Sequence, residues 1–254
     1  MIRNIIDLWE SGHMPRDPHI LRAELFFAHR VCERQFLLEL IPNNSVGAEL
    51  GVFTGLFSSI LARDRRITKV TFVDPWWEAF GSLYPDWGAY TDYGRVNTRK
   101  AYETANIRIA RAALPNRVVE IGYSYDWLAA QPDKCLDWVY VDSTHNYEGT
   151  KRELELLQYK ISDTGIILGD DWQIERSHIH HGVCLAVNEF VKTSNFELIM
   201  AGNRGQWALR HALDGAAAER AAMLQNFETV DYGWQPSTWE AGSQKCSPER
   251  KKQD

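Results

Sequence analysis

The stretch Val46-Gly47-Ala48-Glu49-Leu50-Gly51-Val52-Phe53-Thr54-Gly55 decides the fold of this 254-residue chain. An apolar run reaches an acidic residue, breaks at Gly51 and breaks again at Gly55, after which apolar residues recur at helical spacing. The pattern predicts a strand, a tight turn and the start of a helix. Glycine lets a backbone approach a ligand closely, and the first turn of a helix offers unpaired N–H groups, so this turn is a candidate binding loop.

The spacing of the two glycines limits what the loop can bind. It reads Gly-x-x-x-Gly, with Glu49 two residues before Gly51. A loop that holds a dinucleotide phosphate has the pattern Gly-x-Gly-x-x-Gly, so the absent middle glycine argues against a pyrophosphate here and against an NAD-linked dehydrogenase. An ordinary strand-to-helix turn would have the same sequence, and a function therefore requires further residues.

Three further apolar strands are predicted to end in carboxylates. They are residues 69–74 with Asp74, residues 136–142 with Asp142, and residues 166–172 with Asp170 and Asp171. The carboxyl ends of strands in an open parallel sheet line the ligand crevice, so these acids are expected at one edge. Asp74 follows Gly51 by 23 residues, which places it beside the glycine turn in a β-α-β unit. There it could accept both hydroxyls of a ribose; a solvated aspartate before Pro75 is the alternative.

Three other loops each allow two interpretations. The loop at 76–93 is dense in aromatic side chains, which could form a wall against an adenine or substrate ring or could simply pack on the body of the protein. Ser124, after the strand at 117–123, could bond an adenine edge or cap the next helix. The loop at 178–181 holds three histidines, His178, His180 and His181, which could bind a transition metal or be merely polar.

Strands and helices alternate along the chain, which predicts an α/β fold. Helices are expected at 19–41, 94–113, 124–130, 147–161, 183–191 and 212–227, a turn at 162–165, and a closing hairpin at 196–201 and 206–210. We expect a doubly wound, mostly parallel, seven-stranded Rossmann-like sheet with an antiparallel edge strand. The expected domains are an N-terminal helical cover at 1–44, a ligand-binding domain at 45–211, and a C-terminal helix with a partly disordered tail at 212–254.

Composition narrows the partners and the compartment. The net charge is −6 and the basic residues are scattered, so nucleic acid is not expected as a partner. The first residues are too short and acidic a run for a signal peptide, and no segment is long enough to span a bilayer, which predicts a cytoplasmic protein without a membrane partner. Cys32, Cys135, Cys184 and Cys246 lie far apart and are expected to be reduced thiols. The helix at 19–41 would cover the site or join copies of the chain in a homo-oligomer.

With these residues in place, the chain from 45 to 211 resembles a class I S-adenosylmethionine-dependent methyltransferase. The most specific part is 137–149, Asp-Trp-Val-Tyr-Val-Asp-Ser-Thr-His-Asn-Tyr-Glu-Gly, with 165–171 behind it. Within that fold the chain is similar to metal-dependent O-methyltransferases of small molecules, such as the macrolide-sugar enzymes, and more distantly to cephalosporin hydroxylase-like proteins. The resemblance implies that the methionine part of the cofactor is held by Glu49, Gly51, Thr54 and Gly55, its ribose by Asp74, and its adenine by Tyr123 and Ser124, with Asp142 close by.

The same resemblance implies a magnesium site and a catalytic base. Mg²⁺ would be bound by Asp142, Asp170 and Asp171, hard oxygen donors that suit this ion. His145, helped by Asp142 and the metal, would take the proton of an acceptor hydroxyl. We therefore expect Mg²⁺-assisted O-methylation of a small-molecule acceptor. The alternatives are a protein of this fold that does not methylate, either hydroxylase-like or a cofactor-binding accessory protein, with solvated acids and His145 as a contact to the following helix.

Overall fold

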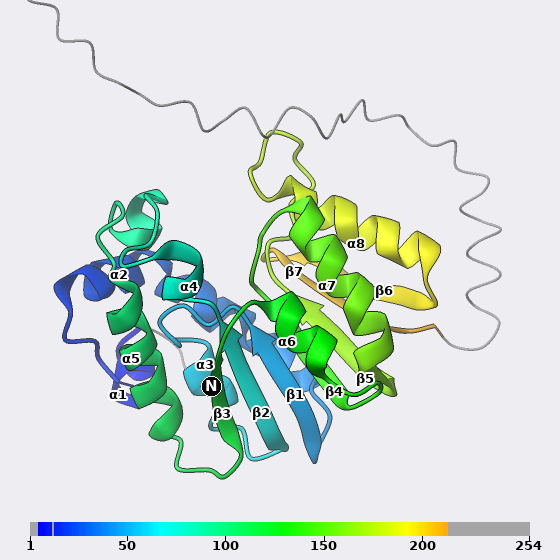
Figure 1. Cartoon of the computed structure of the whole chain (residues 1–254), viewed down its shortest axis with the longest axis horizontal. Coiled ribbons are helices and arrows are strands. Elements are labelled where there is room, and N and C mark those ends of the chain that lie inside the picture. The colour runs from blue at the N-terminus through cyan, green and yellow to red at the C-terminus, as the bar shows by residue number, and fades with distance from the viewer. Residues whose placement is uncertain (1–4, 12, 213–254) are drawn as a thin grey trace, which may run out of the picture. The chain divides into compact units, whose positions relative to one another are not determined.

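The computed structural model describes residues 5–11 and 13–212, which contain a seven-stranded sheet flanked by helices (Figure 1). The strands lie in the order β3-β2-β1-β4-β5-β7-β6. Their bounds are β1 Ser45–Leu50, β2 Ile67–Asp74, β3 Arg117–Ile121, β4 Leu136–Val141, β5 Ile161–Gly169, β6 Phe196–Asn203 and β7 Gln206–His211. Strands β1 to β5 are parallel, whereas β7 is antiparallel to both β5 and β6. The predicted fold class is confirmed.

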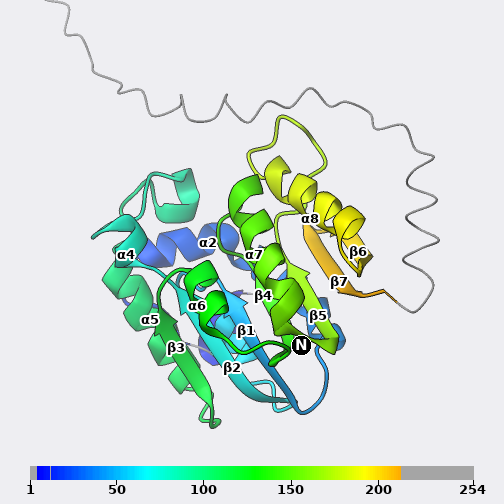
Figure 2. The ribbon, with the colours of Figure 1, turned by 45° about the vertical axis from the view of Figure 1, so that its right-hand side comes forward.

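Helices cover both faces of the sheet. Their bounds are α1 Ile5–Ser11, α2 Pro18–Glu33, the 3-10 helix η1 Arg34–Leu40, α3 Ser58–Leu61, α4 Trp77–Phe80, the 3-10 helix η2 Gly88–Thr91, α5 Thr98–Ala110, α6 Ser124–Ala130, α7 Tyr147–Lys160 and α8 His181–Thr193. Helices α6, α7 and α8 lie together on one face, and α1, α2, α3 and α5 belong to the other (Figures 1 and 2). The carboxyl ends of the parallel strands are thus left open between the two helical layers.

The central strand β4 shows why the sheet is buried on both faces. Trp138 and Tyr140 belong to the apolar cluster under α2, α3 and α5, whereas Val139 and Val141 belong to the cluster under α6, α7 and α8. Successive side chains of a strand point to opposite faces, so a continuous apolar run is what a strand covered on both sides requires. Because β4 and β5 are adjacent and parallel, the acids that follow them lie at the same edge of the sheet.

Two predicted elements differ from the structure. The helix expected at 19–41 starts at Pro18 after the N-cap Asp17, but ends at Glu33, and η1 continues the chain to Leu40. The turn expected at 162–165 is instead part of β5. The chain bulges there without leaving the sheet, because Leu136 pairs with Ile161 and Trp138 already pairs with Ile166.

Other expectations meet limits of what the structure describes. The helix predicted at 212–227, the tail after it and Cys246 lie outside the described residues. Cys32, Cys135 and Cys184 are free thiols, as expected. Among the helices of the described part, none has both the length and the apolar character that crossing a membrane requires.

A buried ion pair fastens the N-terminal helices to the sheet layer. Arg108 of α5 and Glu24 of α2 have fully buried side chains, and Arg108 Nη1 lies 2.6 Å from Glu24 Oε1. Trp9 also donates to Glu24, at 2.8 Å, and Arg108 donates to the carbonyl of Thr54 in the glycine turn at 2.9 Å. The pair therefore connects α2 directly to the glycine turn that follows β1.

Replacing Arg108 by Met should strongly destabilise the protein, because it leaves the Glu24 carboxylate buried without its cation. A loss of about 3–5 kcal/mol in the free energy of unfolding is expected from breaking one side of a buried pair. Urea unfolding followed by circular dichroism measures this loss. The matched variant Arg108→Met with Glu24→Leu should recover much of the stability, and a single variant as stable as the natural chain would contradict the assignment.

Candidate active site

A cavity of about 820 Å³ lies at the carboxyl ends of the parallel strands. Its walls come from the glycine turn, the ends of β2, β4 and β5, helix α2, and the aromatic loop between β2 and α5. The sequence-predicted site residues in its lining are Glu49, Gly51, Thr54, Asp74, Tyr123, Ser124, Asp142, His145, Asp170 and Asp171. The structure thus brings together all the site residues predicted from the sequence except one. Gly55 does not line the cavity.

Both glycines of the opening motif are needed, but for contacts with protein. Gly51 has a φ of +92°, and a Cβ there would lie 1.9 Å from the carbonyl oxygen of Asp142. Gly55 has a φ of +74°, and its Cβ would lie 2.7 Å from Cα of Ala105 in α5. Close approach of β4 and of α5 therefore explains the two glycines, and only Gly51 also faces the cavity.

Asp74 holds the glycine turn in shape. Its carboxylate accepts hydrogen bonds from the backbone N–H groups of Val52 at 2.8 Å, Phe53 at 2.9 Å and Trp76 at 2.8 Å. A carboxylate offers about four acceptor sites, so about one is left for a ligand. Burial raises the pKa of Asp74, although these three bonds oppose the shift. In this arrangement Asp74 can accept one ribose hydroxyl, whereas the sequence suggested two.

Glu49 offers a negative group to the cavity. Its side chain is buried, and Oε2 has no hydrogen-bond partner among the described residues. Burial raises the pKa of Glu49 well above its ordinary value. A buried carboxylate is stable when it is paired with a cation, and the ammonium group of S-adenosylmethionine would supply one. The residue therefore fits the methionine part of that cofactor.

The turn after β3 is tied to α7 by a shared carboxylate. The hydroxyls of Ser124 and Ser143 both donate to Oε1 of the buried Glu153. The Tyr123 ring stacks on Tyr125, with centroids 5.3 Å apart and planes at 19°. Ser124 still lines the cavity, and its oxygen can accept one hydrogen bond, so an adenine amino group remains compatible with this position.

The aromatic loop divides into a packed part and a cavity wall. Trp76 is fully buried, and its indole N–H donates to the Phe53 carbonyl at 2.9 Å, so it is part of the core. Trp77 packs against Tyr102 and does not line the cavity. Trp87 does line it and is 45% exposed. The wall that faces a ligand is therefore made by Phe80, Tyr84, Trp87 and Tyr90.

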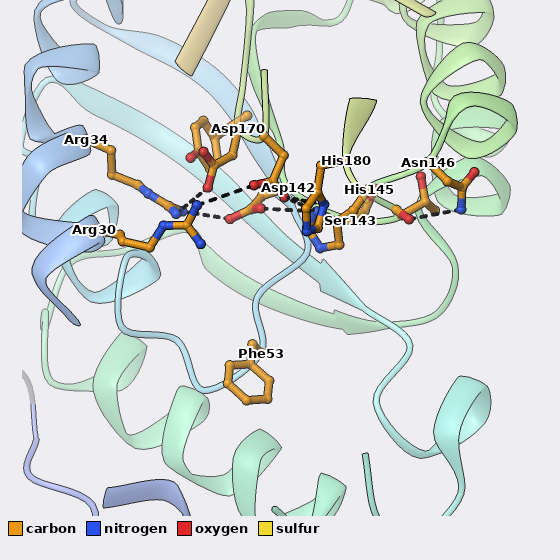
Figure 3. Close-up of polar contacts among 12 residues, drawn as sticks. Arg30, Arg34, Phe53, Asp142, Ser143, His145, Asn146, Asp170 and His180 are labelled. Carbon is orange, nitrogen blue, oxygen red and sulfur yellow. Dashed lines mark hydrogen bonds and ion pairs between the residues drawn. The ribbon is translucent and has the colours of Figure 1, made fainter. Parts of the chain in front are cut away.

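The three strand-end aspartates meet around an arginine. Ligand oxygens of Asp142, Asp170 and Asp171 lie within 4.8 Å of one another. Arg34 reaches between two of them: Nη1 lies 2.7 Å from Asp142 Oδ2, and Nη2 donates to Asp170 Oδ2 (Figure 3). The second oxygen of Asp170 accepts from the amide of Gln206. Burial, with a smaller contribution from Asp170, raises the pKa of Asp142 to about 6 even beside Arg34.

This arrangement does not fit the Mg²⁺ ion that the resemblance implies. Mg²⁺ requires close octahedral contacts with oxygen, at about 2.1 Å. Both carboxylate oxygens of Asp170 are already bound, one by Arg34 and the other by Gln206, and Arg34 also binds Oδ2 of Asp142. Each unit charge of a cation held about 4 Å from the guanidinium would also be repelled by roughly 4 kcal/mol at an effective dielectric constant of 20.

His145 and Asp171 form a second charged pair in the cavity. His145 Nδ1 lies 2.7 Å from Asp171 Oδ2, which leaves Nε2 as the ring nitrogen that can meet a ligand. Although burial acts in the opposite direction, the hydrogen bond to Asp171 and the nearby acids raise the pKa of His145 to about 9. Both residues have positive φ, 52° for His145 and 62° for Asp171. Backbone strain of this kind is often found at functional sites.

Of the three loop histidines, only His180 reaches the acidic residues. Its Nδ1 lies 3.2 Å from Asp171 Oδ2, the oxygen that His145 already contacts, without the geometry of a hydrogen bond. His145, Asp171 and His180 come within 4.8 Å as a two-histidine, one-carboxylate group. His181 instead bonds the Gln173 carbonyl at 2.9 Å, so the trio does not converge on one point.

Several residues of the site were not foreseen from the sequence. Arg30 and Arg34 project from consecutive turns of α2 and η1 toward the aspartates (Figure 3). Arg30 lies 3.7 Å from Asp171. The available indication was a pair of arginines four residues apart in a helix otherwise expected to pack by its apolar face. Glu153 and Gln206 carried no comparable indication, because single polar residues on apolar elements are usually exposed.

Comparison with solved structures identifies the fold. The chain is similar to an S-adenosyl-L-methionine-dependent methyltransferase assigned in Methanococcus maripaludis, with 13% identity, 76% of this chain and 89% of that one covered, and a TM-score of 0.50. A Corynebacterium glutamicum protein shares 12% identity over 78% and 91%, with a TM-score of 0.51. A calicheamicin methyltransferase shares 17% over 73% and 78%, with a TM-score of 0.48. At such identities the likeness concerns the fold alone, which is that of class I S-adenosylmethionine-dependent methyltransferases.

Family comparison is more specific than the structural one. A family model described as a methyltransferase domain matches residues 45–172, half of the chain, and the protein belongs to that family. Membership supports S-adenosylmethionine as the cofactor. No curated protein matches the chain at a significant level. The matched region contains the glycine turn and all three strand-end aspartates, whereas Arg30 and Arg34 precede it.

Proposed function

We propose that the protein transfers a methyl group from S-adenosylmethionine to a hydroxyl oxygen of a small molecule. The single observation that carries this proposal is the position of the His145–Asp171 pair, in the same cavity as Glu49, Gly51 and Asp74. A proton acceptor and a cofactor-binding turn that share one cavity are what O-methylation needs. When bound, S-adenosylmethionine supplies an electrophilic methyl group.

The chain's own residues would then prepare the acceptor oxygen. Asp171 holds the imidazole of His145 by Nδ1, so Nε2 can take the proton of a hydroxyl group as its oxygen attacks the methyl carbon. The proton ends on His145, and the electron pair of the broken carbon–sulfur bond stays on sulfur. Walls that align the acceptor with the methyl group would supply much of the rate. No step of this reaction is assigned to Mg²⁺, because Arg34 binds one oxygen of Asp142 and one of Asp170.

The acceptor is proposed to carry an apolar or aromatic ring. Rings from the loop between β2 and α5 form one wall, and exposed Phe26 and Ile179 add apolar surface from α2 and from the loop before α8. The net charge of −6 supports a small molecule over nucleic acid. The N-terminal helices would act in this reaction as part of the acceptor pocket.

Trp87→Ala should raise the KM for the acceptor about tenfold with little change in kcat, because it removes an aromatic wall that binds substrate and transition state alike. Trp77→Ala is the matched control, since Trp77 lies in the same loop but outside the cavity lining. Steady-state kinetics on both variants make the comparison. Equal KM values for Trp87→Ala and the natural chain would place the acceptor elsewhere.

A transfer assay tests the proposed function itself. The full chain would be incubated with S-adenosylmethionine labelled in its methyl group and a panel of hydroxylated sugars, phenols and polyketide-type alcohols. The proposal expects label in at least one acceptor, with mass spectrometry placing the methyl group on oxygen. Tight binding of S-adenosylhomocysteine with no transfer to any acceptor would instead favour a member of the family that does not methylate.

A further inference from the structure

Arg34 is held in the acidic cluster as a fixed part of the protein. Its side chain is 10% exposed, and its guanidinium lies 5.6 Å from the ring centre of Phe57 and 5.8 Å from that of Tyr140. Two aromatic rings and two carboxylates therefore surround one cation. By contrast, Arg30 is 41% exposed and makes a long contact of 3.7 Å with Asp171.

Most carboxylate oxygens of the cluster are already bound. Asp170 accepts from Arg34 with one oxygen and from Gln206 with the other, and Gln206 is itself fixed by the Tyr140 hydroxyl at 3.0 Å. Asp142 Oδ2 accepts from Arg34. A hard divalent cation needs several such oxygens at once, so it could enter only if Arg34 left a buried position between two rings.

Arg34 belongs to the N-terminal segment, which therefore provides the positive charge at the strand ends. The residue stands where α2 ends and η1 begins, with φ −84° and ψ −2°, and it precedes the region that matches the methyltransferase family. Its side chain points toward the aspartates at the strand ends (Figure 3). The N-terminal segment therefore supplies a charged group to the site as well as a wall.

We propose that Arg34 takes the place of a divalent cation between Asp142 and Asp170, and that the protein works without such an ion. The part of this statement that concerns catalysis rests on the proposed function. Arg34 offsets one of the two negative charges, keeps Asp142 and Asp170 in position, and leaves the His145–Asp171 pair as the proton acceptor.

A Mn²⁺-binding measurement tests the proposal without any acceptor. Bound Mn²⁺ is detected as a loss of the electron paramagnetic resonance signal of the free ion. The full natural chain should leave the signal unchanged up to about 1 mM Mn²⁺, a weak-binding limit of roughly 4 kcal/mol. Arg34→Met keeps the bulk of the side chain and removes its charge. This variant should gain a Mn²⁺ site with a Kd of about 0.1 mM or lower, at least about tenfold tighter than the limit for the natural chain. Arg34→Met with Asp142→Asn should lose it again. Arg65→Met is the matched control and should behave like the natural chain, because Arg65 is exposed and does not line the cavity.

Two results of the Mn²⁺ measurement would overturn the proposal. One is micromolar Mn²⁺ binding by the natural chain that disappears in Asp142→Asn, and the other is a folded Arg34→Met that gains no site. If Arg34→Met does not fold, the natural chain and its Asp142→Asn variant still decide the outcome. Methyl transfer in excess chelator is the second measurement: an unchanged rate supports the proposal, and a rate lost in chelator and restored by Mg²⁺ contradicts it. Failure to find any acceptor would count against the proposed function and leave the Mn²⁺ result valid.

Discussion

His145→Gln is expected to lower kcat by a factor of about 10²–10⁴, the usual contribution of a positioned general base. Glutamine keeps much of the size of the imidazole and can bond Asp171, but it cannot take a proton. Affinity for S-adenosylhomocysteine should stay within about twofold, because the proposed cofactor contacts lie in the glycine turn. Steady-state kinetics with any acceptor from the panel, together with calorimetric binding of S-adenosylhomocysteine, measure the two effects.

The matched control for this variant is His29→Gln. His29 is an exposed histidine of α2 that does not line the cavity, so its replacement should leave kcat and KM unchanged. A His145→Gln protein that retains full kcat would remove the base from the mechanism. The contribution of the protein to the rate would then be limited to binding and aligning the two substrates.

The rate should also rise steeply with pH. The hydrogen bond to Asp171 raises the pKa of His145 to about 9, so near neutral pH only about one molecule in a hundred carries the neutral imidazole that can act as a base. Between pH 7 and pH 9, kcat/KM is therefore expected to increase about fiftyfold, with a slope near one on a logarithmic scale up to about pH 8 and a bend near pH 9. A pH–rate profile in buffers of constant ionic strength measures this increase.

The contribution of His145 to the free energy of unfolding should change with pH in the opposite direction to the rate. Because the pKa of His145 is raised in the folded state, its protonated form stabilises the protein below the ordinary pKa of histidine, and this contribution is lost as the pH rises through about 9.

In His145→Gln the ascending limb of the rate profile should vanish. A flat profile for the natural chain from pH 7 to pH 9 would contradict the assigned pair.

The sheet was predictable because its elements have strong local patterns. Apolar runs that end in acids indicated where β1, β2, β4 and β5 lie in the chain and that they are parallel, and the turn residues 202–205 indicated the antiparallel hairpin. The break of α2 at Glu33 was not predictable in the same way. Apolar residues continue at helical spacing through η1, and only packing of Leu37 and its neighbours against the sheet layer decides where the helix tightens.

The location of a site residue was predictable where it follows directly from the end of a strand. The role of a residue was not predictable where it depends on a partner from another part of the chain. Position along the strands placed Asp74, Asp142, Asp170 and Asp171 at one cavity. Sequence could not show that backbone N–H groups take most of Asp74 or that Arg34, far away in the chain, binds two of the others. Such partners are set by tertiary contacts between elements that no local pattern connects.

The account depends most directly on where the cofactor binds, and a crystal structure with S-adenosylhomocysteine measures that. It should show the ligand beside Gly51, with its ammonium group on Glu49, a ribose hydroxyl on Asp74, and its sulfur on the side of the cavity that holds His145. A ligand bound away from this turn, or one whose sulfur cannot face His145, would contradict the account.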